Sequence, residues 1–243
     1  MTTVVVGASS GLGRALATAL AQRGHELLLV ASDPRDLDAV AADLRVRFDA
    51  RVHVLAIDLA RAPDPGVTVL AALADCPPVQ TLLLAVGWSR PDDDFGLGAA
   101  HIGQLLAINL HAPLAIAHAL LPSLLETRGT IVLFGSVAAV RGRGRNVVYA
   151  AAKRALESLG ESLRQRHAPR ELCVQTYRLG FLATNLTHGL ALPIAAVDPT
   201  VVARIVVDRL GRRSGRWTVP RRFALLTAIV RCLPWPLYRR LRG

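Results

Sequence analysis

Cysteine is scarce in this chain of 243 residues. Its three cysteines, Cys76, Cys173 and Cys232, contain no C-x-x-C pair. That pattern excludes a disulfide scaffold and a cysteine zinc site, and it fits a reducing cytoplasm. The first residues pass directly from Met1 into a valine-rich run, without the basic and apolar regions of a signal peptide. We therefore expect a cytoplasmic protein.

Lysine is also nearly absent, because 28 of the 29 basic residues are arginine and the exception is Lys153. Acidic residues stop at Asp208. Segment 199–243 holds eleven arginines and one acid, a net charge of +10, whereas the rest of the chain carries +1. The basic character therefore belongs to the C-terminal segment. Hydrophobic residues make up 52% of the chain, which excludes disorder and provides for a large core.

Short apolar runs alternate with longer helical patterns along the whole chain. This alternation predicts βαβ units in one α/β domain, a Rossmann-like, doubly wound parallel sheet of about seven strands with helices on both faces. The predicted strands are 4–7, 26–31, 52–57, 80–86, 130–135, 173–178 and 217–219, and the predicted helices are 12–22, 34–48, 70–74, 101–125, 147–167 and 199–210. We expect a catalytic domain over 1–220, followed by a basic, apolar tail over 221–243.

A glycine-rich turn follows the first predicted strand. It reads Gly7-Ala8-Ser9-Ser10-Gly11-Leu12-Gly13 and leads into a helix. Glycines allow positive φ angles and let backbone amides approach a diphosphate at the helix N-terminus. A tight strand–helix connection is the alternative, but the position directly after the first strand favours a nucleotide site.

Two other strand ends face the same predicted crevice. Asp58 and Leu59 follow the third strand, where a carboxylate can accept a hydrogen bond from an adenine amino group. The alternative for Asp58 is a helix cap. Val86 and Gly87 end the fourth strand, where the missing side chain lets a ring pack on the backbone.

The sequence Tyr149-Ala-Ala-Ala-Lys153 places a phenol and an ammonium on one face of a helix. A nearby cation favours the phenolate, so we expect Lys153 to lower the pKa of Tyr149 and prepare it for proton transfer. Ordinary surface residues would explain poorly why the single lysine falls four residues after one of three tyrosines. Ser136 ends the preceding strand, and Asn109 lies in the helix before it.

These motifs follow one another along the chain as they do in the classical short-chain dehydrogenase/reductase family, which the chain resembles over nearly its whole length. The resemblance implies an oxidoreductase in which Tyr149 is the acid/base, Lys153 tunes it and binds the nicotinamide ribose, Ser136 orients the carbonyl and Asn109 supports a proton relay. It implies cofactor contacts at the glycine turn, at the strand ends 58–59 and 86–87, and at Gly180, Leu182 and Thr184. It also implies a homodimer or homotetramer.

The choice of cofactor depends on the end of the second strand. Members of this family that use NAD carry an acid where this chain has Ala31, and Ser32 follows it. Ser32 can bond a 2′-phosphate, with Arg14 or Arg35 supplying charge, so NADP(H) is favoured over NAD(H). Asp33 would repel that phosphate if it turned inward.

Two arginine-rich segments bear on the substrate, a small-molecule or lipid-linked ketone. Arg141, Arg143 and Arg145 precede Tyr149 and suggest an anion site, with a solvated loop as the alternative. The tail is too short and too interrupted to span a bilayer, but it suits an anionic membrane surface; packing on the protein is the alternative. Its cations flank apolar residues, so we expect no nucleic-acid partner. The substrate loop 180–197 is short, which suggests an open cleft or one completed by the tail.

The chain is also similar, more loosely, to the keto-reductase subunit of decaprenylphosphoryl-ribose 2-epimerase. The shared features are the Val86-Gly87 strand end, the arginine-rich loop before Tyr149 and a Val-Pro…Leu-Pro…Tyr-Arg-Arg-Leu ending. This implies a ketone on a lipid-linked or anionic substrate, reduced with NADP(H) at the membrane surface. A soluble 3-oxoacyl-thioester reductase is the alternative enzyme. A non-catalytic NAD(P)-binding sensor or scaffold is the alternative from another class, although binding alone does not need Tyr149 and Lys153.

Overall fold

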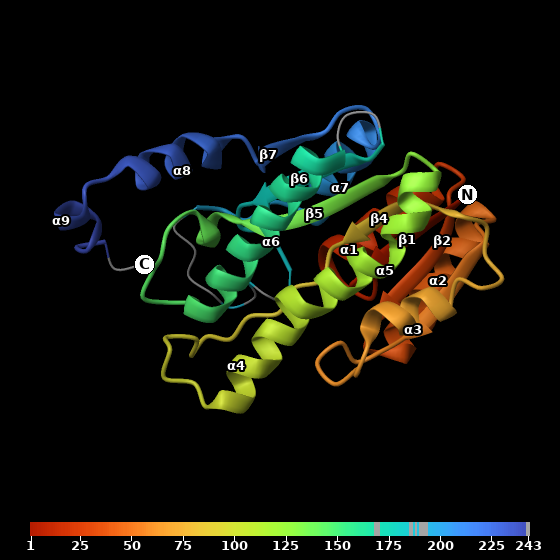
Figure 1. Ribbon diagram of the computed structural model, residues 1–243, viewed down its shortest axis with the longest axis horizontal. Helices are drawn as coiled ribbons and strands as arrows, with labels where there is room; N and C mark the ends of the chain where they lie inside the picture. Colours follow the sequence, from red (N-terminus) through yellow and green to blue (C-terminus); the bar gives the residue numbers. More distant parts are fainter. Residues whose placement is uncertain (168–170, 185–186, 188, 190–193, 242–243) are drawn as a thin grey trace.

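The computed structural model describes residues 1–167, 171–184, 187, 189 and 194–241. Seven parallel strands form one sheet in the order β3-β2-β1-β4-β5-β6-β7 (Figure 1). The strands are β1 Thr2–Val6, β2 Glu26–Ala31, β3 Val52–Ala56, β4 Val79–Leu84, β5 Thr130–Ser136, β6 Cys173–Leu179 and β7 Gly215–Val219. The predicted α/β fold and all seven predicted strands are confirmed.

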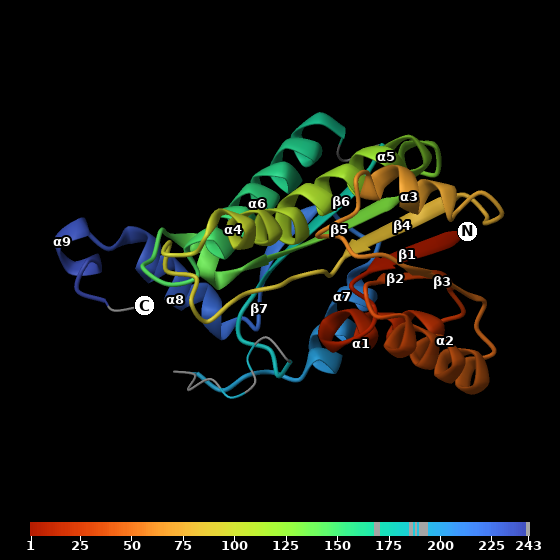
Figure 2. The same cartoon turned by 90° about the horizontal axis from the view of Figure 1, so that it is seen from below.

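Helices cover both faces of the sheet (Figure 2). On one face lie α1 Gly11–Ala21, α2 Pro34–Phe48 and α7 Pro199–Arg209, and on the other lie α3 Pro65–Ala71, α4 Ala99–Leu106, α5 Ala112–Glu126 and α6 Val147–His167. Each layer buries its own apolar cluster against the sheet, because both faces of the strands carry leucine and valine.

The predicted helix 101–125 is interrupted. A π-helical turn, Ala107–His111, separates α4 from α5. Pro113 explains the break, because it lacks the backbone N–H that would bond one turn back. The run Ala99–Glu126 is apolar and long enough to cross a membrane by length and composition. Here it packs on the sheet through the fully buried Ile116, Leu120 and Leu124.

The C-terminal segment forms two helices that we did not predict, α8 Arg222–Cys232 and α9 Trp235–Tyr238. Figures 1 and 2 place both at the end of the molecule away from the N-terminus. Phe223 is fully buried and packs edge-on against Phe181, with ring centroids 5.7 Å apart. The start of the tail is therefore built into the domain, and the division at residue 220 stays a prediction.

Candidate active site

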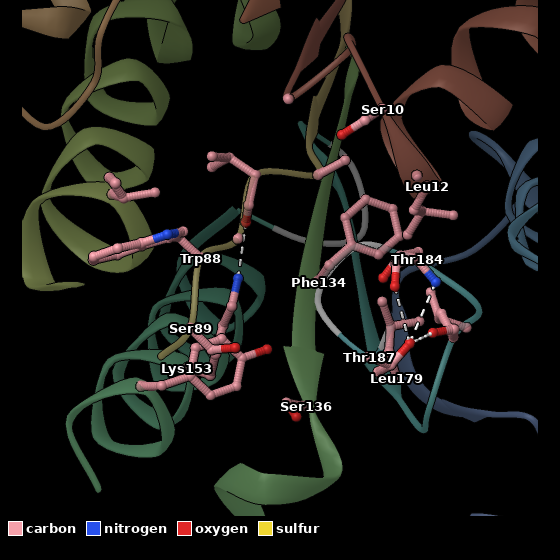
Figure 3. Close-up of a pocket in the computed structure, with 18 of the residues that line it drawn as sticks. Ser10, Leu12, Trp88, Ser89, Phe134, Ser136, Lys153, Leu179, Thr184 and Thr187 are labelled. Carbon is pink, nitrogen blue, oxygen red and sulfur yellow. Dashed lines mark hydrogen bonds between the residues drawn. The ribbon is translucent and has the colours of Figure 1, made fainter. Parts of the chain in front are cut away.

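A cavity of about 660 Å³ opens at the carboxyl ends of the central strands. It lies where the strand order reverses between β1 and β4, the usual ligand crevice of such sheets. Figure 3 shows Ser10 and Leu12 on one side of β5, Trp88, Ser89 and Lys153 on the other, and Ser136 at the end of the strand. The predicted cofactor residues that line this cavity are Gly7, Ser9, Ser10, Gly11, Leu12, Ser32, Asp58, Leu59, Val86, Gly87, Gly180, Leu182 and Thr184.

The glycine turn has the geometry of a diphosphate cradle. Gly7 and Gly11 have φ angles of +88° and +51°, and a Cβ on Gly13 would lie 1.9 Å from the carbonyl oxygen of Gly7. Gly13 therefore packs under the turn without lining the cavity. Ser10 caps α1 without a side-chain hydrogen bond, so the amides of the first turn remain available for an anion.

The far end of the cavity, beside β2 and β3, carries Ser32 and Asp58. Asp33 turns away to cap α2, because its carboxylate accepts hydrogen bonds from the amides of Arg35 (2.9 Å) and Asp36 (3.2 Å). Asp58 likewise accepts a hydrogen bond from the Ala60 amide at 2.9 Å. This contact closes a turn and caps no helix, because the next helix, α3, is capped by Asp64. The helix-cap alternative for Asp58 is therefore wrong, and Asp58 lines the cavity.

The expectation that Arg14 or Arg35 supplies charge beside Ser32 is not supported. Arg14 donates to the carbonyl oxygen of Ser9 at 3.0 Å, and neither arginine lines the cavity. The Arg14 side chain instead holds the backbone of the glycine turn at Ser9.

Ser136, Tyr149 and Lys153 converge at the opposite end of the cavity. Burial raises the pKa of Tyr149 above its ordinary value, and a hydrogen bond with Ser136 acts in the other direction. Burial also lowers the pKa of Lys153 from 10.5 to about 8. Desolvation gives the largest contribution to the shift of the Tyr149 pKa, and the Lys153 Nζ lies 5.9 Å from the phenol ring centroid. The tuning of Tyr149 by Lys153 stays a prediction.

Lys153 Nζ donates to the carbonyl oxygen of Val86 at 2.9 Å (Figure 3). A Cβ on Gly87 would approach that Nζ to 3.5 Å and Asn109 Oδ1 to 3.8 Å. Gly87, which follows β4, thus leaves room for the side chains of Lys153 and Asn109.

Asn109 lies in the π-helical turn, fully buried. Its Nδ2 donates to the carbonyl oxygens of Trp88 (2.7 Å) and Leu105 (3.0 Å), and its Oδ1 accepts from the Trp88 amide (3.1 Å). The side chain thus fixes Trp88, which lines the cavity, whereas Asn109 itself does not. Its predicted part in a proton relay stays a prediction.

Asp93 is a residue that sequence reasoning missed. Its side chain is buried, and its carboxylate accepts hydrogen bonds from the amides of Val148 (3.0 Å) and Tyr149 (2.9 Å). Its carbonyl oxygen accepts from Val147 at 3.1 Å. Asp93 therefore caps α6 from a segment more than fifty residues earlier, where no local spacing could reveal it.

Known proteins with similar sequences identify the family of this chain. The family described as short chain dehydrogenase matches residues 1–193. An uncharacterized oxidoreductase of Mycobacterium tuberculosis is 31% identical over 98% of this chain and 95% of its own. The chain belongs to the short-chain dehydrogenase/reductase family. It is an NAD(P)-dependent oxidoreductase.

Two further relatives of this dehydrogenase have informative names. A very-long-chain 3-oxoacyl-CoA reductase of Phaeosphaeria nodorum is 28% identical over 89% of this chain and 65% of that protein. A short-chain dehydrogenase from Sphingobium yanoikuyae, solved in complex with NADPH, has a TM-score of 0.83 and 27% identity over 100% of this chain and 96% of its own.

On the remaining side of the cavity, the dehydrogenase presents Leu182 and Thr184 after β6. Leu182 is buried and bridges to Val197, and the Thr184 amide donates to Thr187 Oγ1 at 3.3 Å (Figure 3). Thr187 also lines the cavity and was not predicted. Loop 180–197 lies partly outside the described residues.

The three loop arginines of the dehydrogenase have different surroundings. The expectation that Arg141 binds an anion is wrong, because Arg141 donates to the carbonyl oxygens of Val230 (3.1 Å) and Leu233 and stacks 4.1 Å from the ring centroid of Tyr238. Arg145 is exposed and does not line the cavity. Only Arg143 of the three lines it.

Proposed function

We propose that this dehydrogenase uses NADP(H) to reduce a ketone on a lipid-linked or otherwise anionic substrate. The observation that carries the proposal is the single cavity that joins the glycine turn to Ser136, Tyr149 and Lys153. The cofactor supplies the hydride to the carbonyl carbon when bound. The rest of the chemistry belongs to the side chains around the carbonyl oxygen.

In this proposal Tyr149 gives its proton to the carbonyl oxygen, and a secondary alcohol results. A phenol with an ordinary pKa carries its proton at neutral pH, and burial shifts the pKa of Tyr149 further in that direction, which suits reduction. Ser136 orients the carbonyl, and Lys153 binds the nicotinamide ribose. Asn109 fixes Trp88 at the edge of the cavity and supports the proton relay.

The preference for NADP(H) is supported by the end of β2. Ala31 offers no carboxylate to the ribose, Ser32 lines the cavity, and the carboxylate of Asp33 is committed to the cap of α2. The Sphingobium relative binds NADPH. Titration of nicotinamide fluorescence should show tighter binding of NADPH than of NADH, and Ala31→Asp should reverse the order. Tighter NADH binding by the wild type would contradict the preference.

Turnover distinguishes the enzyme from a nucleotide sensor. Tyr149→Phe should lower kcat by at least about 10²-fold, in line with the loss of a general acid, and leave NADPH affinity within about twofold. Unchanged function in that variant would support the sensor or scaffold.

The membrane part of the proposal rests on α8 and α9. Leu225, Ile229 and Trp235 are 71%, 52% and 64% exposed, arginines such as Arg231 and Arg239 accompany them, and no acid follows Asp208. A surface with this composition complements an anionic bilayer at the cytoplasmic face. A symmetric contact between two copies through this surface would place arginine near arginine.

Flotation with vesicles tests this surface. Full-length protein should float with phosphatidylglycerol vesicles and much less with phosphatidylcholine vesicles. Leu225→Ser/Trp235→Ser should weaken binding about tenfold or more, because each side chain buries apolar area. The matched control is Val46→Ser/Val67→Ser, since Val46 and Val67 are exposed on α2 and α3. Equal flotation of both variants would refute membrane binding through α8 and α9.

The second candidate is a 3-oxoacyl-thioester reductase, which the fungal 3-oxoacyl-CoA reductase relative favours. Oxidation of NADPH by acetoacetyl-CoA, without any vesicle requirement, would support that candidate. The homodimer or homotetramer implied by the family stays a prediction, and light scattering of the purified protein tests it.

A further inference from the structure

Arg143 stands in the wall of the cavity with an unsatisfied donor. It belongs to the connection that begins at Ser136 and ends at Tyr149, and it lines the cavity with both. Its Nε is fully buried and has no hydrogen-bond partner among the described residues. Buried donors in folded proteins are almost always paired, so the unpaired Nε shows that no acceptor in the described part of the chain holds this guanidinium. The cavity that Arg143 lines is where an acceptor from outside the chain can meet the cation.

The other cations of the cavity wall have acceptors. Arg90 makes a two-pronged pair with Asp92, with both distances 2.8 Å, and Lys153 donates to Val86. Of the cations on the described part of the wall, Arg143 alone lacks a partner there. Among the described lining residues the one carboxylate is Asp58, at the end of the cavity beside β3.

Arg143 lies away from the place expected for a cofactor 2′-phosphate. Ser32 follows β2, whereas Arg143 follows β5, and β1 and β4 lie between these strands. Arg143 therefore lines the cavity from the same connection, between β5 and α6, that carries Ser136 and Tyr149 at its ends.

The loop is also held on both sides of Arg143. Arg141 is fixed to α8 and Tyr238, and the Tyr238 hydroxyl donates to the carbonyl oxygen of Gly142. On the other side, Asp93 holds the amides at the start of α6. A guanidinium on such a supported loop is pre-organised, so less entropy is lost on binding.

We infer that Arg143 binds an oxyanion of the substrate, a carboxylate or a phosphate, carried on the same molecule as the ketone that is reduced. This rests on the proposed function. The planar fork of arginine suits both anions, since each can accept two parallel hydrogen bonds.

Paired ketones test the inference with the NADPH-loaded enzyme. One series contains straight-chain keto acids of increasing length, each beside its methyl ester, and the other compares dihydroxyacetone phosphate with dihydroxyacetone. The wild type should favour the anionic member by about 10- to 100-fold in kcat/KM, as expected for a charge-assisted hydrogen bond. The series with the larger preference distinguishes carboxylate from phosphate.

Three variants complete the test. Arg143→Met should bring the preference ratio close to one, and Arg143→Lys should retain part of it because the charge remains. Arg145→Met is the matched control, because it removes the same charge from the same loop outside the cavity. A preference that survives in Arg143→Met, or no preference in the wild type, overturns the inference.

A binding measurement separates this inference from the proposed function. Calorimetry with inorganic phosphate and hexyl phosphate, added to NADPH-loaded protein, should show binding that Arg143→Met weakens at least about tenfold. Equal binding by the two proteins overturns the inference. If the protein binds NADPH but reduces no ketone of either series, the proposed function fails, and the phosphate result still decides the role of Arg143.

Discussion

The carboxylate of Asp93 accepts a hydrogen bond from the backbone amide of Tyr149 at 2.9 Å. Tyr149, the residue proposed to transfer the proton, is thereby tied to the segment after β4, which lines the cavity through residues 86–91. Asn109 fixes the same segment at Trp88, and Lys153 fixes it at Val86. Three side chains therefore hold segment 86–93 against α6 and the π-helical turn.

Replacing Asp93 should disturb catalysis as well as stability. We expect Asp93→Ala to lower the free energy of unfolding by about 1–2 kcal/mol, the usual cost of a lost helix cap. We expect kcat to fall more than tenfold and NADPH affinity to fall less, because the glycine turn, Ser32 and Asp58 do not depend on α6, which contributes only Tyr149 and Lys153 to the cofactor side of the cavity. Urea unfolding and steady-state kinetics measure these effects.

Two results control this prediction. Asp94→Asn should behave like the wild type, since Asp94 is exposed and contacts only its own turn. If kcat for Asp93→Ala falls no more than expected from the fraction unfolded, Asp93 is only a structural cap.

Lys153 should make stability depend on pH. Its pKa is about 8 in the folded protein and 10.5 as an ordinary lysine, so between these values the unfolded chain binds more protons. The free energy of unfolding therefore rises with pH across this window. Relative to Lys153→Met, the wild type should gain about 2 kcal/mol between pH 7.5 and 9.5. Urea unfolding at both values measures the gain, and parallel curves for the two proteins would contradict it.

The buried pair of Glu157 and Arg178 should be costly to break singly. Arg178 Nε donates to Glu157 Oε1 at 3.0 Å, and its Nη2 donates to Oε2. Glu157→Leu should lower the free energy of unfolding by about 3–5 kcal/mol, because it leaves a buried cation unpaired. Glu157→Leu/Arg178→Met should recover most of this loss.

An exposed ion pair provides the comparison for the buried pair of Glu157 and Arg178. On the surface of α2, Arg47 Nη1 lies 3.0 Å from Asp43 Oδ2. Asp43→Ala should lower the free energy of unfolding by less than about 1 kcal/mol. If Asp43→Ala and Glu157→Leu lower the free energy of unfolding equally, burial does not determine the cost of breaking the pair of Glu157 and Arg178.

Gly180 should tolerate no side chain. A Cβ there would lie 2.4 Å from the Phe223 ring, so Gly180→Ala should destabilise the protein by about 1–3 kcal/mol through overpacking. Gly103→Ala, in the exposed part of α4 with open space, should instead stabilise by about 0.5–1 kcal/mol. Thermal unfolding distinguishes the pair, and Phe223→Leu should partly rescue Gly180→Ala. A stable Gly180→Ala protein would contradict the close packing.

The fold was predictable because its signals are local. Each strand is a short apolar run, and the bounds of α2 and α6 match the predicted ranges. The candidate site was predictable where motifs mark it, from Gly7 to Lys153. The raised pKa of Tyr149 was not, because desolvation depends on how the whole cavity packs. Asp93 and the contacts of Arg141 were missed for a related reason, since their partners lie more than fifty residues away in sequence.

The contacts of the C-terminal helices imply a constraint on evolution and engineering. Phe223 packs on Gly180 beside the proposed nicotinamide site, and Tyr238 stacks on Arg141 in the connection between β5 and α6. Among relatives, residues 180 and 223 should therefore covary, as should 141 and 238. A chimera that exchanges the last two helices should retain activity only if segments 141–146 and 179–184 are exchanged with them.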